Sequence, residues 1–194
     1  MNDLSLAGRH GLVTGGFGPL GLALANHLAE CGATVLAVDL TEQIDRVRVE
    51  EIHPRVEPVP CDLLVGEQVD ELVASVEKRA DGLSFLVNNA AFTGGSGLEG
   101  YACSFEEQTD EAFDAALALN LAVPFRLTRR LTPSLRRSNH GSIVNIGSIY
   151  GLVGPDLSLY SGTSMGNPAG YAASKGGLIQ LTRYLATVLA PEIR

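Results

Sequence analysis

The chain has 194 residues, 45% of them hydrophobic and 19% charged, and a formal net charge of −8. This composition is typical of a compact globular protein and excludes a disordered or fibrous one, while the negative charge offers no basic surface to nucleic acid. No stretch reaches the ~18 apolar residues of a membrane-spanning helix, and the first ten residues lack a signal-peptide pattern. We therefore expect a cytoplasmic protein with no nucleic-acid and no membrane partner.

Short apolar runs rich in β-branched residues alternate along the chain with longer segments of helical period. This alternation predicts an α/β fold in which a parallel sheet is covered by helices on both faces. We expect one domain spanning residues 1–194. The predicted strands are residues 11–14, 34–38, 56–59, 83–87 and 142–146.

The first predicted helix follows the first strand, and its apolar residues recur at helical spacing. Leu20, Leu24 and Leu28 form the predicted apolar face. The helix should stop at Gly32, because glycine can take the left-handed conformation of a helix C-terminus.

Three further helices are predicted downstream. One is centred on residues 69–76, and a long one runs from about residue 110 to 137 with a bend near Pro124. The last begins near Asn167 and Pro168, where asparagine would cap the helix and proline would take its first position.

A glycine-rich turn, residues 14–21 (TGGFGPLG), directly follows the first strand. Gly16, Gly18 and Gly21 satisfy the pattern GxGxxG, which places bare backbone against a diphosphate at the positive end of a helix. Asp39 closes the second strand, where a carboxylate would accept hydrogen bonds from ribose hydroxyls and repel a 2′-phosphate. The motif predicts NAD rather than NADP; the alternative is an ordinary glycine turn with Asp39 in solvent.

Several polar residues could carry out chemistry near the carboxyl ends of the strands. Tyr171 and Lys175 lie four residues apart on one face of the last helix, where an ammonium would lower the pKa of the phenol; the alternative is an exposed helical pair. Ser148 follows the fifth strand and could donate to a substrate carbonyl, and residues 88–91 (NNAA) end the fourth strand at the same edge. Asn120 lies inside the long helix, where asparagine is a poor helix former.

Together, the glycine turn, Asp39, Asp62-Leu63, NNAA and the YAASK segment at 171–175 resemble the short-chain dehydrogenase/reductase family from the first strand to the end of the chain. The resemblance implies a three-layer Rossmann-type, doubly wound sheet that binds a nicotinamide dinucleotide. It implies four catalytic residues: Tyr171 as general acid/base, Lys175 on the nicotinamide ribose, Ser148 orienting the carbonyl, and Asn120 holding a water. The cofactor-binding residues that the motifs and the resemblance indicate are Gly15, Phe17, Gly18, Leu20, Gly21, Asp39, Leu40, Asp62, Leu63, Asn88, Ala90, Ala91, Tyr171 and Lys175.

The chain departs from the usual family pattern in three places. Pro19 stands where most single-domain members have glycine, which a helix start tolerates. The segment 151–170 is longer than usual and is expected to form a substrate-side loop. This loop resembles that of flagellin modification protein A-like and other surface-polysaccharide oxidoreductases, which points to a sugar or nucleotide-sugar substrate. The chain also stops at Arg194, where family members begin a sixth strand, so we expect the C-terminal strands to be missing.

These observations predict an NAD(H)-dependent oxidoreductase that transfers a hydride between nicotinamide and a secondary alcohol or ketone. One alternative is a nucleotide-sugar epimerase or dehydratase that retains NAD, and another is a non-catalytic dinucleotide-binding module. No metal site is expected, because the four histidines show no ligand spacing. By resemblance, the protein would assemble as a homodimer or homotetramer through the long helix and the last one.

Overall fold

The computed structural model of the chain describes residues 5–163 and 166–194, and these residues form two compact units. The sheet unit comprises the residues up to Ala90 together with Leu127–Ile146 and Val188–Arg194. The second unit comprises Ala91–Arg126 and Gly147–Thr187. Each unit is therefore built from segments that are not continuous in the sequence.

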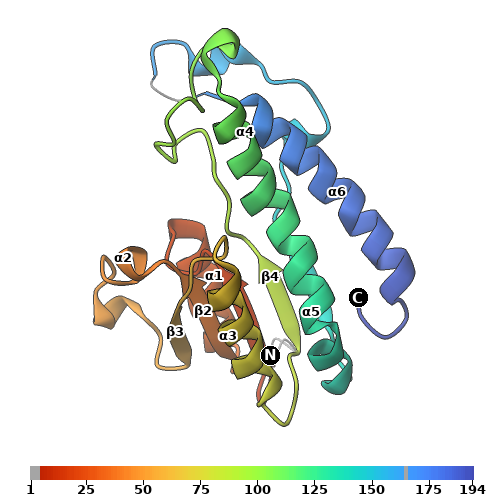
Figure 1. The fold of residues 1–194 in the computed structure, drawn as a ribbon. Coiled ribbons are helices and arrows are strands. Elements are labelled where there is room, and N and C mark those ends of the chain that lie inside the picture. The colour runs from red at the N-terminus through yellow and green to blue at the C-terminus, as the bar shows by residue number, and fades with distance from the viewer. Residues whose placement is uncertain (1–4, 164–165) are drawn as a thin grey trace. The chain divides into compact units, whose positions relative to one another are not determined.

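Five parallel strands form the sheet in the order β3-β2-β1-β4-β5, which is the doubly wound topology expected from the sequence (Figure 1). The strands are β1 (His10–Thr14), β2 (Thr34–Asp39), β3 (Val56–Pro60), β4 (Phe85–Asn88) and β5 (Ser142–Asn145). β4 begins two residues later than predicted, because the Leu83 amide donates to the Ser134 carbonyl (3.1 Å) instead of joining the ladder.

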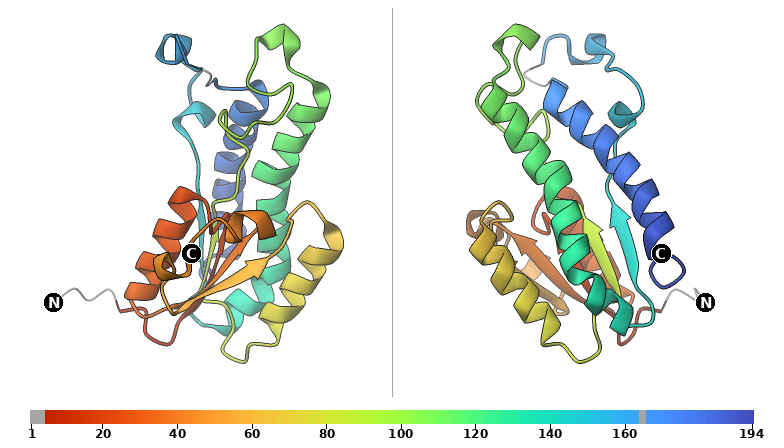
Figure 2. Two further views of the ribbon diagram at one scale, coloured as in Figure 1. Left: turned by 90° about the vertical axis from the view of Figure 1, so that its left-hand side faces the viewer. Right: turned by 45° about the vertical axis from the view of Figure 1, so that its right-hand side comes forward.

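Helices cover both faces of this sheet. Successive strand residues point to opposite faces, so Val13, Val35 and Ala37 pack on one side with Ala25 and Ala29 of α1 (Pro19–Glu30). The opposite side carries α3 (Gly66–Glu77), and the left view of Figure 2 shows α1 and α3 on opposite sides of the sheet. The three-layer α/β prediction is confirmed.

The buried face of α1 differs in part from the predicted leucine stripe. Gly21, Ala25 and Ala29 are buried, and Leu24 and Leu28 pack against the same core as predicted, whereas Leu20 is 53% exposed. Small residues face the strands because the helix lies close to the sheet behind the glycine turn. Its predicted end is confirmed, since Gly32 has a φ of +104° and its amide donates to the Ala29 carbonyl (2.9 Å).

The long helix is interrupted where a bend was predicted. It consists of α4 (Asp110–Leu117), a π-helical turn η3 (Ala118–Ala122) and α5 (Val123–Arg137). Pro124 has no N–H, so it cannot make the α-helical bond to the carbonyl four residues earlier, that of Asn120. The π-helical turn therefore contains Asn120, the residue that the sequence marked as a poor helix former.

The last helix, α6 (Ala169–Leu189), begins where predicted, but its cap is different. The Ala169 amide donates to the side-chain oxygen of Gln108 (2.9 Å). Both polar atoms of the Asn167 side chain are buried without a hydrogen-bond partner in the described part of the chain. The prediction that Asn167 caps this helix is wrong, because a glutamine 61 residues away in sequence supplies the acceptor.

The segment before α6 has little regular structure, as expected for the loop at 151–170, of which residues 164–165 lie outside the described residues. It contains two single 3₁₀ turns, η4 (Ile149–Gly151) and η5 (Leu157–Tyr160). The remaining short helices of the chain are α2 (Thr41–Ile44), η1 (Val49–Glu51) and η2 (Phe105–Glu107). Within the described ranges, no helix is long and apolar enough to cross a membrane.

Candidate active site

The glycine-rich turn of the sheet unit is closed by contacts between backbone atoms. Gly15 has a φ of +62°, which glycine adopts without strain. A Cβ placed on Gly21 would lie 1.8 Å from the Gly15 carbonyl oxygen, and one on Gly16 would lie 2.8 Å from the Ala37 Cβ. At Gly16 and Gly21 the turn therefore has room for a hydrogen atom but not for a Cβ.

The amide groups at the start of α1 can receive an anion. Gly18 caps the helix without a side-chain hydrogen bond, and Pro19 takes the first helical turn as the sequence predicted. The first turn contains no acidic residue that would repel a negative charge. Free N–H groups and the helix dipole favour a phosphate at this position, so the turn fits the diphosphate of a dinucleotide.

Asp39 lies at the end of β2 and links this strand to the glycine turn. One carboxylate oxygen accepts a hydrogen bond from the Phe17 amide and the other from the Leu40 amide, both at 2.9 Å. Each oxygen keeps a further lone pair for a ligand hydroxyl. The carboxylate is thus held beside the turn, as the motif predicted.

Two residues that the sequence analysis did not identify connect β1 to β4. The Thr14 hydroxyl accepts hydrogen bonds from the amides of Asn89 and Ala90, both at 3.0 Å. The Asn89 side chain donates to the carbonyls of Thr14 (2.9 Å) and Gly15 (3.0 Å). Asn89 therefore fixes the glycine turn, a role that the NNAA segment suggested only in general terms.

The other predicted cofactor residues of the sheet unit lie at or near the ends of strands. Asn88 is buried and donates to the Asn145 side chain (2.7 Å), while its own side-chain oxygen has no partner among the described residues. An Asp62 carboxylate oxygen accepts from the Leu64 amide (2.9 Å), and Leu63 is buried. The half-buried Ala91 begins the second unit.

All four predicted catalytic residues belong to the second unit: Asn120, Ser148, Tyr171 and Lys175. Asn120 is 1% exposed, and its side chain is fully engaged. It accepts from the Phe92 amide (2.8 Å) and donates to the Phe92 carbonyl (3.0 Å) and to the Ser174 hydroxyl (3.1 Å). The π-helical turn thus presents a side chain that joins two other segments of this unit.

Ser148 begins the turn η4, where its hydroxyl oxygen accepts from the Tyr150 amide (3.2 Å). This turn packs against α6, because a Cβ on Gly151 would lie 2.6 Å from the Lys175 carbonyl carbon. The turn that Ser148 begins is therefore in backbone contact with α6 at Lys175.

Tyr171 and Lys175 share one face of α6, as their spacing predicted. The Lys175 ammonium nitrogen lies 5.7 Å from the centre of the Tyr171 ring. Lys175 is only 3% exposed, and burial lowers its pKa from 10.5 to about 8. A cation at this position stabilises negative charge on the phenol, which is the arrangement needed for proton transfer.

The buried lysine makes a stability prediction. The unfolded chain holds this proton up to pH 10.5 but the folded chain only to about 8, so the free energy of unfolding should rise with pH across this window. Across the whole window, Lys175 should raise the free energy of unfolding by about 3 kcal/mol, and Lys175→Met should remove this pH-dependent rise. Urea denaturation across the window measures the difference in pH dependence between the two proteins.

The exposed Lys78 provides the matched control, because Lys78→Met should keep the pH dependence of the native sequence. Titrating groups remote from Lys175 contribute equally to all three proteins. An identical pH dependence in Lys175→Met and the native chain would contradict the prediction.

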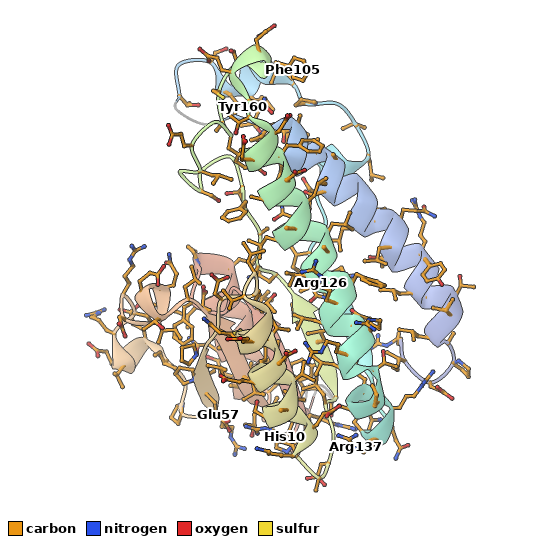
Figure 3. All side chains as sticks on the ribbon, in the orientation of Figure 1. His10, Glu57, Phe105, Arg126, Arg137 and Tyr160 are labelled. Atoms are coloured by element: carbon orange, nitrogen blue, oxygen red, sulfur yellow. The ribbon has the colours of Figure 1, made fainter. Side chains whose placement is uncertain are left out.

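Four further tyrosines lie in the second unit and were not identified from the sequence: Tyr184 on α6, and three in the segments outside that helix. Tyr150 and Tyr160 pack with ring centres 6.5 Å apart, and a hydrogen bond to Tyr150 raises the pKa of Tyr160. Tyr101 is 2% exposed and packs in a cluster that includes Tyr171. Figure 3 shows Tyr160 at the same end of this unit as Phe105. No sequence signal marks the three outside α6, because they come from irregular segments.

Known proteins similar to this chain match it over almost its whole length. A family model described as short chain dehydrogenase matches residues 9–194. A 3-oxoacyl-acyl-carrier-protein reductase of Thermotoga maritima is 31% identical over 96% of this chain and 70% of its own length. The 5-keto-D-gluconate 5-reductase of Escherichia coli is 28% identical over 98% and 70%, respectively.

Solved structures with bound dinucleotides show the same fold. A short-chain dehydrogenase from Leptospira borgpetersenii with bound NAD+ has a TM-score of 0.84 and 28% identity, covering 100% of this chain and 71% of that one. The Pseudomonas aeruginosa RhlG complex with NADP has a TM-score of 0.80 and 29% identity, covering 99% and 72%. Similar chains thus hold either form of the cofactor.

Proposed function

This chain belongs to the short-chain dehydrogenase family and is an NAD(P)-dependent oxidoreductase, and from that premise we propose that it interconverts a secondary alcohol and a ketone with NAD as cofactor. The nicotinamide, when bound, supplies or accepts the hydride. In the reducing direction the carbonyl carbon gains the hydride and the carbonyl oxygen gains a proton from the Tyr171 hydroxyl. This balances the two electrons and the proton of the reaction.

The observation that carries this proposal is the Tyr171–Lys175 pair. The buried ammonium 5.7 Å from the Tyr171 ring favours the phenolate that remains after the proton has been transferred. Ser148, held against α6 through Gly151, would donate its hydroxyl proton to the substrate oxygen. Asn120 would act through its backbone carbonyl on a water, because its side chain is occupied and Pro124 offers that carbonyl no N–H.

Asp39 supports NAD over NADP. Its two oxygens are fixed by the amides of Phe17 and Leu40, so the carboxylate cannot turn away from a ligand at the turn. It would accept hydrogen bonds from the two ribose hydroxyls of NAD, and its charge would repel the 2′-phosphate of NADP. Gly15, Gly18 and Gly21 would hold the diphosphate.

For the substrate we propose a polyhydroxylated ketone, such as a keto-sugar acid or a nucleotide-sugar. The loop at 151–170 supports this class by its resemblance to polysaccharide-modifying members, and the similar 5-keto-D-gluconate reductase supports it independently. Assays with NADH and a panel of keto-sugars, keto-sugar acids and 3-oxoacyl thioesters test it. Faster turnover of the thioesters would contradict the substrate class, and turnover of no carbonyl compound would contradict the function.

Replacing Asp39 tests the cofactor preference. Asp39→Asn keeps an acceptor for one of the two backbone amides, loses the acceptor for the other and removes the charge, so kcat/KM with NADPH should rise relative to that with NADH by about tenfold or more. Steady-state kinetics with both cofactors measure this ratio. Asp45→Asn, at an exposed position after α2, serves as the control. An unchanged ratio in Asp39→Asn would show that this carboxylate does not face the ribose.

A further inference from the structure

Tyr101 is a buried tyrosine for which the proposed reaction has no use so far. It lies in the irregular segment between β4 and α4 and is 2% exposed. Its hydroxyl donates to the Phe92 carbonyl at 3.3 Å. A buried tyrosine hydroxyl usually has a hydrogen-bond partner. Here the partner is Phe92, which also binds the catalytic candidate Asn120.

The Phe92 carbonyl is shared between Tyr101 and Asn120. The Asn120 side chain donates to this same oxygen at 3.0 Å. Tyr101, Phe92 and Asn120 therefore form a triangle of polar groups that meet at the Phe92 carbonyl. Loss of any one of them would loosen the other two.

The triangle continues to Tyr171 through one more side chain. The Asn120 side chain donates to the Ser174 hydroxyl (3.1 Å), and that hydroxyl donates to the Tyr171 carbonyl (2.8 Å). An unbroken series of hydrogen bonds thus runs from the Tyr101 hydroxyl to the backbone of Tyr171. All of these residues belong to the second unit.

The Tyr101 ring contacts the same region by packing. Tyr101 forms an apolar cluster with Ala112 and Ala116 of α4, and Tyr171 packs against this cluster. The start of α6 has no free space there, because a Cβ on Gly170 would lie 3.1 Å from the Ala116 Cβ. Tyr101 therefore supports the Tyr171 side chain as well as its backbone.

From these contacts we propose that Tyr101 is a positioning residue for proton transfer, which holds Tyr171 and Asn120 in their reactive arrangement. The inference rests on the proposed role of Tyr171 as the proton-transfer group. Tyr101 touches neither substrate nor cofactor in this scheme and acts through Phe92, Asn120 and the packed ring of Tyr171.

Tyr101 remains a hydrogen-bond donor throughout the working pH range. Burial, together with the nearby Tyr171 and against the lowering effect of Asn120, raises its pKa to about 12. Among the described residues, Lys175 and Tyr160 are further titratable groups that interact with Tyr171. A change in pH dependence on altering Tyr101 would therefore reflect the position of Tyr171 and not the titration of Tyr101.

Tyr101→Phe tests the hydroxyl while keeping the ring. Loss of one hydrogen bond to Phe92 should lower kcat about tenfold, with KM and NADH affinity unchanged. The pH profile of kcat should shift as well, because Tyr171 is held less firmly beside the Lys175 ammonium. Tyr184→Phe, at a 60% exposed position of α6, is the matched control and should behave as the native chain.

NMR of ¹³C-labelled tyrosine gives a readout that does not require turnover. The chain has five tyrosines, so the Tyr171 signal can be assigned by comparison with Tyr171→Phe. Tyr101→Phe should shift or broaden the Tyr171 signal and leave that of Tyr184 in place. An unchanged Tyr171 signal would overturn the inference.

The kinetic outcomes separate the inference from the proposed function. A native kcat and pH profile in Tyr101→Phe would overturn the positioning role, as would a lower kcat that follows only a loss of folded protein with an unmoved pH profile. If the native chain turns over no carbonyl compound, the proposed function fails, and the NMR comparison still decides whether Tyr101 positions Tyr171.

Discussion

Tyr171→Phe is expected to lower kcat/KM by about 10² to 10⁴, the usual contribution of a general acid or base. The substitution removes only the phenolic oxygen, so the apolar packing of the ring against the Tyr101 cluster is kept. NADH affinity should stay nearly unchanged, because the proposed diphosphate and ribose contacts come from the glycine turn and Asp39. Steady-state kinetics and fluorescence titration with NADH measure the two quantities.

Tyr184→Phe makes the same chemical change on the same helix at an exposed site, and it should retain full activity. Comparing the two variants separates loss of the reactive hydroxyl from a general effect of removing a tyrosine oxygen. Turnover near the native rate in Tyr171→Phe would remove this residue from the mechanism.

Gly21→Ala is expected to abolish cofactor binding and to destabilise the fold. The added methyl group would lie 1.8 Å from the Gly15 carbonyl oxygen and 2.9 Å from the Asn89 side-chain nitrogen. The turn must open, which breaks the Asn89 hydrogen bonds to Thr14 and Gly15 and displaces the amides at the start of α1. We expect a loss of about 2 to 3 kcal/mol in the free energy of unfolding, as for an overpacked core.

Gly66→Ala is the control for this substitution. Gly66 begins α3, and a Cβ there would meet no atom within 4 Å, so alanine should be tolerated. Urea denaturation and NADH titration of both variants test the difference. A Gly21→Ala protein with native stability and affinity would show that the turn does not close around position 21.

The sequence predicted the sheet well because its strands carry local signals. β1, β2 and β4 are short apolar runs that are largely buried, and parallel pairing buried on both faces needs no other pattern. The edge strands β3 and β5 are more exposed but still carry valine or isoleucine. The glycine turn, Asp39 and the Tyr171–Lys175 pair were also predictable, since each depends on neighbours within one strand, turn or helix. Gly32 ended α1 as expected for the same reason.

The remaining features depend on contacts between distant segments. Gln108 caps α6 from 61 residues away, so the local pattern wrongly favoured Asn167. The exposed Leu20 has the hydrophobicity of a core residue, but the close approach of α1 to the strands selected smaller residues. Tyr101 lies in an irregular segment whose path no periodicity reveals, and only its contacts with Phe92 and Tyr171 give it a role.

The discontinuous second unit also has a consequence for how the protein reaches its active form. Asn120 comes from its first segment, whereas Ser148, Tyr171 and Lys175 come from its second, and residues 127–146 of the sheet unit separate the two. During synthesis on the ribosome, the first segment emerges with Phe92 as a partner for the Asn120 amide but without Ser174, which follows in the second segment. The Asn120–Ser174 hydrogen bond closes a loop of 54 residues, so it can form only after Ser174 has been synthesised. The catalytic residues are therefore brought together only after most of the polypeptide has been translated.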